Sequence, residues 1–330
     1  MASVFLLGPG YLGLTIIENL LAANYKVSTL VRSPESASKL GSIGVHTIAG
    51  TLEDGPLITE QVIQHEIIIN CSSSDHVQSV RAILSGIRQR VQAGLSSTFI
   101  HTSGTGLLCD NAKGAYKTDI VYSDDNPSMI DALPSTALHR NVDLTIVEAA
   151  REFGDKAKLV ITIAPVIYGI NPNNDRISFA LPTLVKFALK HGFSGRIGKG
   201  ENTWSCIHVN DLARAYMTLL AYLESPASSE TVLSNPYFFA DNGAEFVWGK
   251  FAELVGRVLH QMGKISTEEV KPFEEKHYPD VFGPITEFTA GGNSRTKSVR
   301  LANLGWRPTE KDVLGSMEED EIPFILGIQK

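Results

Sequence analysis

The stretch Val4-Phe5-Leu6-Leu7-Gly8-Pro9-Gly10-Tyr11-Leu12-Gly13 decides the fold of this chain. The apolar run Val4–Leu7 is typical of a buried strand, and the amphipathic segment Tyr11–Ala23 after it is typical of a helix. A G-x-G-x-x-G pattern stands between them, where the strand ends and the helix begins. In this position the pattern predicts a loop that binds the pyrophosphate of a dinucleotide.

Each glycine of this loop has its own physical role. Gly8 permits the tight turn, Gly10 lets the backbone approach a phosphate without a Cβ, and Gly13 allows the helix to pack closely on the strand. The start of the helix adds free N–H groups and the positive end of the helix dipole. The predicted phosphate-binding residues are therefore Gly8, Gly10, Tyr11, Leu12 and Gly13.

Strands and helices alternate through the first half of the chain. Strands are predicted at Val4–Leu7, Lys26–Val31, Val45–Ala49, Ile67–Cys71, Thr98–Thr102 and Leu159–Ala164. Helices are predicted at Tyr11–Ala23, Ser36–Leu40, Leu57–Gln64, Asp75–Gln92 and Thr136–Phe153. Continuous apolar runs suit a parallel sheet that is covered on both faces. The sequence therefore predicts an α/β fold with a doubly wound parallel sheet of the Rossmann type.

The second half of the chain loses this regular alternation. We expect an NAD(P)-binding domain over residues 1–165 and a smaller C-terminal substrate-binding lobe over residues 166–330. Residues of about 205–240 are expected to return to the core of the first domain. A helix, a strand and a second helix are predicted at Val209–Leu223, Tyr237–Ala240 and Glu245–Met262.

Composition argues against several classes of protein. The 330 residues carry a net charge of −7 and no run rich in Lys or Arg, so a nucleic-acid-binding face is not expected. Gly8 ends the first apolar run after four residues, which is too short for a signal peptide or a membrane span. Cys71, Cys109 and Cys206 lie far apart, which fits neither a disulfide framework nor a metal site. We therefore expect a cytoplasmic protein with no metal and no membrane partner.

The end of the second predicted strand indicates which dinucleotide binds. An Asp or Glu there holds the ribose 2′-hydroxyl of NAD, whereas an Arg suits the 2′-phosphate of NADP. Arg32 and Ser33 follow the strand, while Glu35 lies beyond Pro34. A guanidinium can bind a phosphate through two parallel hydrogen bonds. Arg32, with the Ser33 hydroxyl as a further donor, therefore predicts NADP as the cofactor, with NADPH preferred over NADH.

Four further motifs are spread over nearly the whole chain. They are Phe99–Thr105, Ile163–Gly169, Trp204–Ala213 and Leu304–Pro308. In that order they resemble four motifs of the extended and atypical short-chain dehydrogenases/reductases, the superfamily that includes nucleotide-sugar epimerases. These are the post-strand serine segment, the Arg-Pro-x-x-x-Tyr-Gly nicotinamide loop, the His-Val-x-Asp-x-Ala helix start and Leu-Gly-Trp-x-Pro. Ala164 replaces the arginine of the nicotinamide loop.

Two departures separate this chain from the family pattern. The usual G-x-x-G-x-x-G would place its first glycine at Leu7, so the loop is an atypical variant. The Tyr-x-x-x-Lys pair is also missing: counting back from Glu148, which resembles a glutamate often found downstream, puts Leu144 at the lysine and Arg140 at the tyrosine. The proton relay of the family therefore cannot be carried over to this chain.

The resemblance also implies further cofactor contacts and a homodimer. The contacts would come from the ends of the fourth and fifth strands and from the nicotinamide loop. These residues are Cys71, Ser72, Thr102, Pro165, Val166 and Ile167.

Ser103, His139 and Tyr168 are the candidate catalytic residues. In the family, the serine that matches Ser103 hydrogen-bonds the reacting oxygen, and Thr105 offers a second hydroxyl nearby. A histidine can move a proton near neutral pH, and Asp143, one helical turn beyond His139, is expected to orient it. Tyr168 is placed to reach a substrate carbonyl. Each residue also has a structural interpretation: a serine bonded to backbone, a solvated helix surface, and a ring packed under the loop.

The sequence leaves three functions open. The first is an NADP(H)-dependent oxidoreductase that acts on a small organic carbonyl, imine or activated alkene, with hydride transfer supplied by the cofactor. The second is a non-catalytic NADP(H)-sensing regulator, as a resemblance to nitrogen metabolite repression regulators implies. The third is an enzyme that retains the cofactor as a scaffold and catalyses a non-redox isomerisation or cyclisation.

Overall fold

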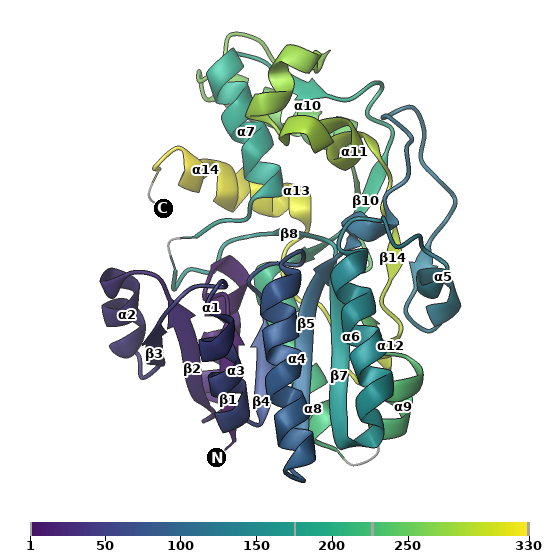
Figure 1. Cartoon of the computed structure of the whole chain (residues 1–330). Coiled ribbons are helices and arrows are strands. Elements are labelled where there is room, and N and C mark those ends of the chain that lie inside the picture. Colours follow the sequence, from purple (N-terminus) through teal and green to yellow (C-terminus); the bar gives the residue numbers. More distant parts are fainter. Residues whose placement is uncertain (1, 175, 226–227, 329–330) are drawn as a thin grey trace.

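A parallel seven-stranded sheet forms the centre of the protein (Figure 1). In the computed structural model, which describes residues 2–174, 176–225 and 228–328, the strand order is β3-β2-β1-β4-β5-β7-β11. The order along the chain reverses between β1 and β4, and open α/β sheets bind their ligands at such a switch point. The strands are β1 (Ser3–Leu7), β2 (Lys26–Val31), β3 (His46–Ala49), β4 (Ile67–Asn70), β5 (Ser97–Gly104), β7 (Ala157–Ala164) and β11 (Tyr237–Phe239).

Helices cover both faces of this sheet, which confirms the doubly wound α/β fold. One face carries α1 (Tyr11–Ala22), α2 (Pro34–Gly41), α8 (Val209–Glu224), α9 (Ser228–Ser234) and α12 (Arg300–Asn303). The other carries α3 (Gly55–Gln64), α4 (Val77–Gln92), α5 (Pro127–Asp131) and α6 (Arg140–Phe153). Short 3₁₀ turns lie at η1 (Thr105–Leu108) and η2 (Gly154–Lys156). Strands such as β4 are buried along their whole length, as a covered parallel sheet requires.

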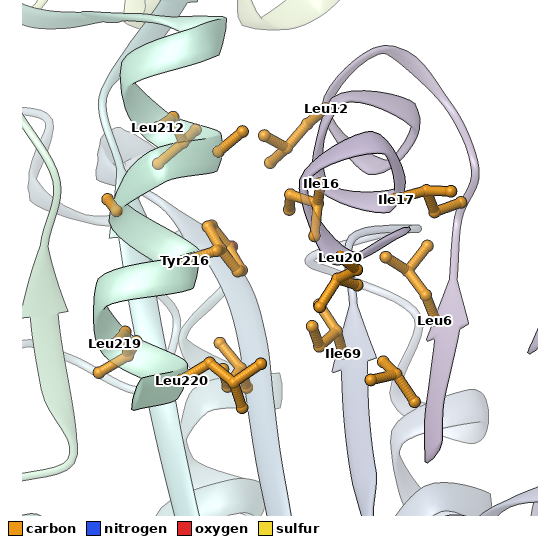
Figure 2. Close-up of a cluster of buried hydrophobic side chains, with 14 of the residues drawn as sticks. Leu6, Leu12, Ile16, Ile17, Leu20, Ile69, Leu212, Tyr216, Leu219 and Leu220 are labelled. Carbon is orange, nitrogen blue, oxygen red and sulfur yellow. The ribbon is translucent and has the colours of Figure 1, made fainter. Parts of the chain in front are cut away.

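Helices α1 and α8 pack side by side over the start of the sheet (Figure 2). Leu12, Ile16 and Leu20 recur every fourth residue of α1 and so form one apolar face. Leu212 and Tyr216 present the matching face of α8. Burying each such side chain contributes roughly 1.5–3 kcal/mol. This contact brings a helix from the second half of the chain onto the phosphate loop of the first half.

A smaller C-terminal lobe lies over the carboxyl ends of the strands (Figure 1). Its sheets are β12-β10-β8, β13-β9 and β14-β6. The strands are β6 (Tyr122–Ser123), β8 (Val166–Tyr168), β9 (Ser194–Arg196), β10 (Thr203–His208), β12 (Glu245–Val247), β13 (Val270–Pro272) and β14 (Thr296–Lys297). The helices are α7 (Ala180–His191), α10 (Trp248–Gln261), η3 (Glu275–Asp280), η4 (Gly283–Ile285), α11 (Thr286–Gly291), α13 (Val313–Ser316), η5 (Met317–Glu321) and α14 (Ile322–Ile325). The lobe therefore lies on the side of the sheet where the switch point opens.

Three predicted helices begin later than expected, and the one predicted at Asp75–Gln92 begins at Val77. The helix predicted at Thr136–Phe153 begins at Arg140, because His139 has a φ of +67° and stands before the helix as its N-cap. The helix predicted at Glu245–Met262 begins at Trp248, because the three residues before it form β12 and pair antiparallel with β10. Tertiary pairing overrides helical periodicity at this last boundary.

A buried carboxyl group ties the C-terminal segment to the phosphate loop. The Gly169 N–H donates to Glu321 Oε1 at 2.9 Å, and the Tyr11 hydroxyl donates to the Gly169 carbonyl at 2.6 Å. Glu321 is fully buried, and burial raises the pKa of its carboxyl to about 7. Its charged form therefore costs free energy in the folded protein.

Replacing Glu321 with Gln should stabilise the protein at pH 8 and have little effect at pH 5. Because the pKa is raised on folding, the stability that the carboxyl contributes is fully present below about pH 4.5 and is lost as the pH rises through about 7. Gln retains an oxygen for the Gly169 N–H without the charge. The expected gain at pH 8 is about 3 kcal/mol at most. Thermal melts at the two pH values measure it.

The matched control is Glu60→Gln, which removes the same charge from an exposed position on α3. This control should shift the melting temperature equally at pH 5 and pH 8. A Glu321→Gln effect that is also equal at the two pH values would show that Glu321 titrates as an ordinary glutamate.

Candidate active site

The glycine-rich turn is held against the end of β4. Gly8 has a φ of +89°, and a Cβ on it would lie 2.4 Å from the Cα of Ser72. A Cβ on Gly13 would lie 2.0 Å from the carbonyl oxygen of Gly8. These positions require glycine, and they agree with the tight turn and the close helix–strand packing expected there. The Ser72 N–H and hydroxyl both donate to Asn70 Oδ1, at 3.1 and 2.5 Å, which fixes this strand end.

Gly10 faces open space instead. It is the N-cap of α1, no side chain caps the helix, and a Cβ on Gly10 would have nothing within 4 Å. The N–H groups of the first helical turn have no intrahelical acceptor, and they carry the positive end of the helix dipole. An uncapped helix start beside an empty space that a Cβ would enter fits a dinucleotide pyrophosphate.

The side chains of Tyr11 and Leu12 are occupied elsewhere. Leu12 is buried between α1 and α8, and the Tyr11 hydroxyl is bonded to Gly169. Only their backbone groups can contact a phosphate. The Gly169 loop continues over α1, where Asn171 donates to Glu18 at 2.7 Å. The loop therefore closes one side of the space in front of the helix.

Arg32 is exposed beyond the end of β2, and its guanidinium has no hydrogen-bond or ion-pair partner among the residues that the structure describes. Ser33 is the N-cap of α2, and its hydroxyl oxygen accepts from the Ser36 N–H at 3.2 Å. Glu35 lies in the first turn of α2 and is exposed. The strand end therefore presents an exposed guanidinium at the position from which the sequence analysis predicts the choice of dinucleotide.

Cys71 and Thr102 lie under α8 and not on the face of β5 that carries Ser103. The Thr102 hydroxyl contacts the Tyr216 hydroxyl at 2.5 Å and Cys71 Sγ at 3.4 Å. Burial raises the pKa of the Cys71 thiol to about 12, so it stays protonated. Neighbouring residues of a strand point to opposite faces, so Ser103 faces α6. The predicted cofactor contacts of Cys71 and Thr102 are therefore restricted to their backbone.

The predicted nicotinamide loop joins the two parts of the protein. Pro165 links β7 to β8, Val166 is buried in the core of the C-terminal lobe, and Ile167 is half-buried against the core under α8. The prediction that Tyr168 is catalytic does not agree with the geometry. Its hydroxyl donates to the Lys311 carbonyl at 2.7 Å and accepts from the side chain of Asn242 at 3.0 Å.

The surroundings of Tyr168 explain this correction. Its ring is fully buried and packs edge-on against His208. Burial also raises the pKa of the Tyr168 hydroxyl, which keeps it protonated. The residue therefore anchors the C-terminal segment beneath the loop, as the structural interpretation of the sequence allowed.

Ser103 and Asp143 form a buried pair between β5 and α6. The Ser103 hydroxyl lies 3.0 Å from Asp143 Oδ2. Ser103 is 1% exposed and Asp143 is fully buried. Loss of hydration raises the pKa of the Asp143 carboxyl to about 7.

His139 lies against the end of the same strand. Its Nδ1 contacts Asp75 Oδ1 at 2.8 Å, so Nδ1 carries a proton. Its Nε2 would lie 3.2 Å from a Cβ on Gly104 and 3.4 Å from one on Gly106, and it has no hydrogen-bond partner among the described residues. A left-handed backbone at a residue other than glycine is strained, and such strain gathers at functional sites.

One expectation about the start of α6 is wrong. Asp143 does not orient His139, because its carboxyl faces Ser103; Asp75 orients the imidazole instead. Arg140, at the position counted for the family's tyrosine, is buried, and its guanidinium is turned to the Tyr237 hydroxyl at 3.1 Å. The N-cap residue His139 and Asp143 of α6 thus lie against the end of β5. Each lies one residue before the position counted from Glu148, which was Arg140 for the tyrosine and Leu144 for the lysine.

The sequence patterns did not indicate Asp75 and His101 as site residues. Asp75 lies 64 residues from His139, so no local spacing links them. His101 is fully buried, its Nδ1 contacts the Asn70 amide at 3.2 Å, and burial lowers its pKa to about 3. It stands two residues before Ser103 on the same face of β5, and this alternation was a usable signal.

Comparison with known proteins identifies the class. The sequence profile of the 3-beta hydroxysteroid dehydrogenase/isomerase family matches residues 4–271. An uncharacterised protein of Schizosaccharomyces pombe is 25% identical over 320 residues, which cover 94% of this chain and 96% of that protein. The sterol-4-alpha-carboxylate 3-dehydrogenase (decarboxylating) of Dictyostelium discoideum is 26% identical over 227 residues, 64% of this chain and 65% of that one.

Solved structures share the fold. UDP-glucose 4-epimerase from Stenotrophomonas maltophila, solved with bound NAD, superposes with a TM-score of 0.70 at 14% identity and covers 99% of each chain. Fold and motifs thus define an extended short-chain dehydrogenase/reductase. Within that superfamily, the chain belongs to the 3-beta hydroxysteroid dehydrogenase/isomerase family.

Other classes of site find no support among the described residues. No group of three His, Cys, Asp or Glu side chains in that part of the chain could hold a metal ion. None of the helices described there has the length and apolar character needed to cross a membrane.

Replacing Gly10 with Ala should abolish dinucleotide binding and leave the fold intact. The backbone of Gly10 has a φ of −94° and open space beside it, so Ala fits without strain, but its methyl group enters the space that a pyrophosphate would fill. Calorimetry with NADPH and circular dichroism measure the two outcomes.

Gly8→Ala is the contrasting variant, because its Cβ would meet the backbone of Ser72. It should lower thermal stability as well as binding. Wild-type affinity in Gly10→Ala would show that this glycine only shapes a turn.

Proposed function

We propose that the protein is an NADP(H)-dependent oxidoreductase that reduces a small organic carbonyl, imine or activated alkene. Membership of a dehydrogenase family supports redox chemistry. The uncapped start of α1 supports a bound dinucleotide. The observation that carries the proposal is His139, which Asp75 holds against the end of β5, where open α/β sheets bind their ligands.

The preference for NADP rests on Arg32. An exposed guanidinium without a partner among the described residues can bind a 2′-phosphate through two hydrogen bonds at little cost in lost contacts. The only carboxylate close by in the sequence is Glu35, which lies on α2 beyond the strand end. The structures that share this fold include several solved with NAD, so the choice between cofactors needs a direct measurement.

His139 is the proposed proton donor. When bound, the reduced nicotinamide supplies a hydride to the substrate. The substrate oxygen or nitrogen then needs a proton, and His139 Nε2 donates it. Asp75 keeps the other nitrogen protonated and stabilises the imidazolium before transfer. Ser103 lies at the same strand end and hydrogen-bonds the reacting atom.

Replacing Arg32 with Ala should weaken NADPH binding and leave NADH binding almost unchanged. Loss of a charge-assisted pair costs about 1.5–3 kcal/mol, or roughly ten- to hundredfold in Kd. Calorimetric titration with each cofactor measures it. Arg81→Ala, an exposed arginine on α4, is the control and should change neither value. Equal losses of affinity for NADPH and NADH would contradict the assignment of Arg32 as the residue that binds the 2′-phosphate.

Replacing His139 with Gln should reduce turnover by on the order of 10²-fold, the range of a lost general acid. NADPH affinity should not change, because the phosphate loop lies elsewhere. Asp75→Asn should cause a smaller loss, because the imidazole remains but loses its orienting charge. Single-turnover oxidation of NADPH with a panel of aldehydes, ketones, imines and enones, from pH 5 to 9, measures these rates.

His260→Gln, at an exposed site on α10, is the matched control and should retain the wild-type rate. A wild-type rate and pH profile in His139→Gln would mean that water or the substrate supplies the proton. NADPH binding without oxidation of the cofactor by any compound of the panel would instead favour the sensor or the non-redox enzyme.

A further inference from the structure

Ser103 and Asp143 form a buried hydrogen bond, and no other described hydrogen-bond partner of Asp143 decides which of the two side chains is the donor. The two side chains meet at 3.0 Å between Ser103 Oγ and Asp143 Oδ2. The second carboxyl oxygen, Asp143 Oδ1, is buried and has no hydrogen-bond partner among the described residues. A single hydroxyl is therefore the only described hydrogen-bond partner of this carboxyl group.

The nearest cation does not pair with Asp143. Arg140 lies one turn earlier on α6, and its guanidinium is directed to the Tyr237 hydroxyl of β11 and, at 3.6 Å, to Asp131 of α5. Its charge favours the ionised form of Asp143 from a distance and without a hydrogen bond. An ionised carboxylate in this position lacks the usual compensation for burial.

The other titratable groups near Asp143 come from the elements packed around it. Asp75, from the segment before α4, disfavours a second negative charge nearby. His139 at the start of α6 is bonded to Asp75 and not to Asp143. His101 of β5 is neutral, because burial lowers its pKa to about 3. Among the described residues, Arg140 and Asp75 are the charged groups that shift the pKa of the Asp143 carboxyl.

We propose that Asp143 decides whether Ser103 donates or accepts a hydrogen bond in the active site. While Asp143 is ionised, the Ser103 hydroxyl donates to it, and Ser103 Oγ offers the site only lone pairs. Once Asp143 is protonated, the acid O–H donates to Ser103 Oγ. The serine hydrogen is then released to donate to a substrate oxygen.

The protonated and ionised states of Asp143 suit reduction and oxidation of the substrate, respectively. This inference therefore rests on the proposed oxidoreductase function. A carbonyl that accepts a hydride develops negative charge on its oxygen and needs a donor, which the protonated pair supplies. An alcohol that gives up a hydride needs an acceptor for its O–H, which the ionised pair supplies. Asp143 does not touch the substrate in either state, and it is therefore a positioning residue that acts through Ser103.

Burial makes both states accessible near neutral pH, because it raises the pKa of Asp143 to about 7. An ordinary aspartate would be ionised throughout that range. Below this pH, Asp143 is protonated and Ser103 can donate a hydrogen bond to the substrate. Above it, Asp143 is ionised and Ser103 can only accept one.

The first test follows Asp143 itself and needs no substrate. Protein labelled with ¹³C at the aspartate carboxyl is titrated by NMR, with Asp143→Asn used to assign the resonance. We expect a transition near pH 7. Ser103→Ala should move the transition to higher pH, because the ionised form loses its donor, and Ser103→Thr should restore it.

A second aspartate gives an internal control. Burial raises the pKa of Asp241 to about 6, and Asp241 accepts a hydrogen bond from Thr296 at 3.0 Å. Its transition should not move in Ser103→Ala. If Asp143→Asn does not fold, the Asp143 resonance is still recognised as the one that moves in Ser103→Ala. A transition below pH 5, or one that ignores Ser103→Ala, would overturn the proposal.

The second test asks whether Asp143 acts through Ser103 during turnover. Asp143→Asn offers Ser103 Oγ an amide N–H, as the protonated acid does. It should therefore retain kcat for carbonyl reduction without the pH dependence near 7, and lower kcat for alcohol oxidation about tenfold, with NADPH affinity unchanged. In a Ser103→Ala background the same change should alter kcat less than twofold. A full tenfold loss in that background would show a role independent of the serine and would overturn the proposal.

The two tests separate this inference from the function on which it rests. Failure of every carbonyl compound to oxidise NADPH would refute the oxidoreductase function, while the NMR titration would still report the bond between Asp143 and Ser103. Turnover together with an ordinary titration of Asp143 would retain the function and refute the switch.

Discussion

The close approach of the β1–α1 turn to the end of β4 is the constraint on which the rest of the site depends. At Gly8 the backbone comes so near to Ser72 that no side chain fits, and at Gly13 the helix touches the turn itself. These contacts hold α1 at a fixed distance from the sheet and leave its first turn uncapped. The helix then offers its free N–H groups to a ligand, while α8 supports it from the other side.

Much of this arrangement was predictable, because periodicity and turn chemistry are local. The six strands and the helices of the first half follow from apolar runs and from the glycine pattern, and the structure confirms the fold they imply. The start of α6 was not predictable, because His139 has a left-handed backbone, a conformation that residues other than glycine adopt only rarely. Tyr168 looked catalytic from its motif alone, and only its partners Lys311 and Asn242 show that its hydroxyl is used structurally.

The candidate site shows even more clearly that local sequence patterns do not predict which side chains meet. Ser103 and His139 could be proposed individually from the sequence, since strand ends and helix starts can be located from local patterns. It paired His139 with Asp143 because they share a helical face, but a shared face does not decide where a side chain points. Asp143 turns inward to Ser103, and Asp75 comes from a distant segment to meet the imidazole. Contacts between short polar side chains that lie far apart in the chain are not indicated by any periodic pattern in the sequence.

The proposed role of His139 would explain physically why the Tyr-x-x-x-Lys pair is missing. In the family, a lysine lowers the pKa of the tyrosine, because a phenol is otherwise a poor acid–base group near neutral pH. A histidine needs no such cation, because imidazole already exchanges protons in that range. A lysine beside His139 would oppose the imidazolium, whereas a carboxylate stabilises it, and Asp75 supplies that carboxylate. Under this proposal no cation is required one turn along α6, and the buried acid Asp143, one residue before the position counted for the lysine, bonds the serine instead.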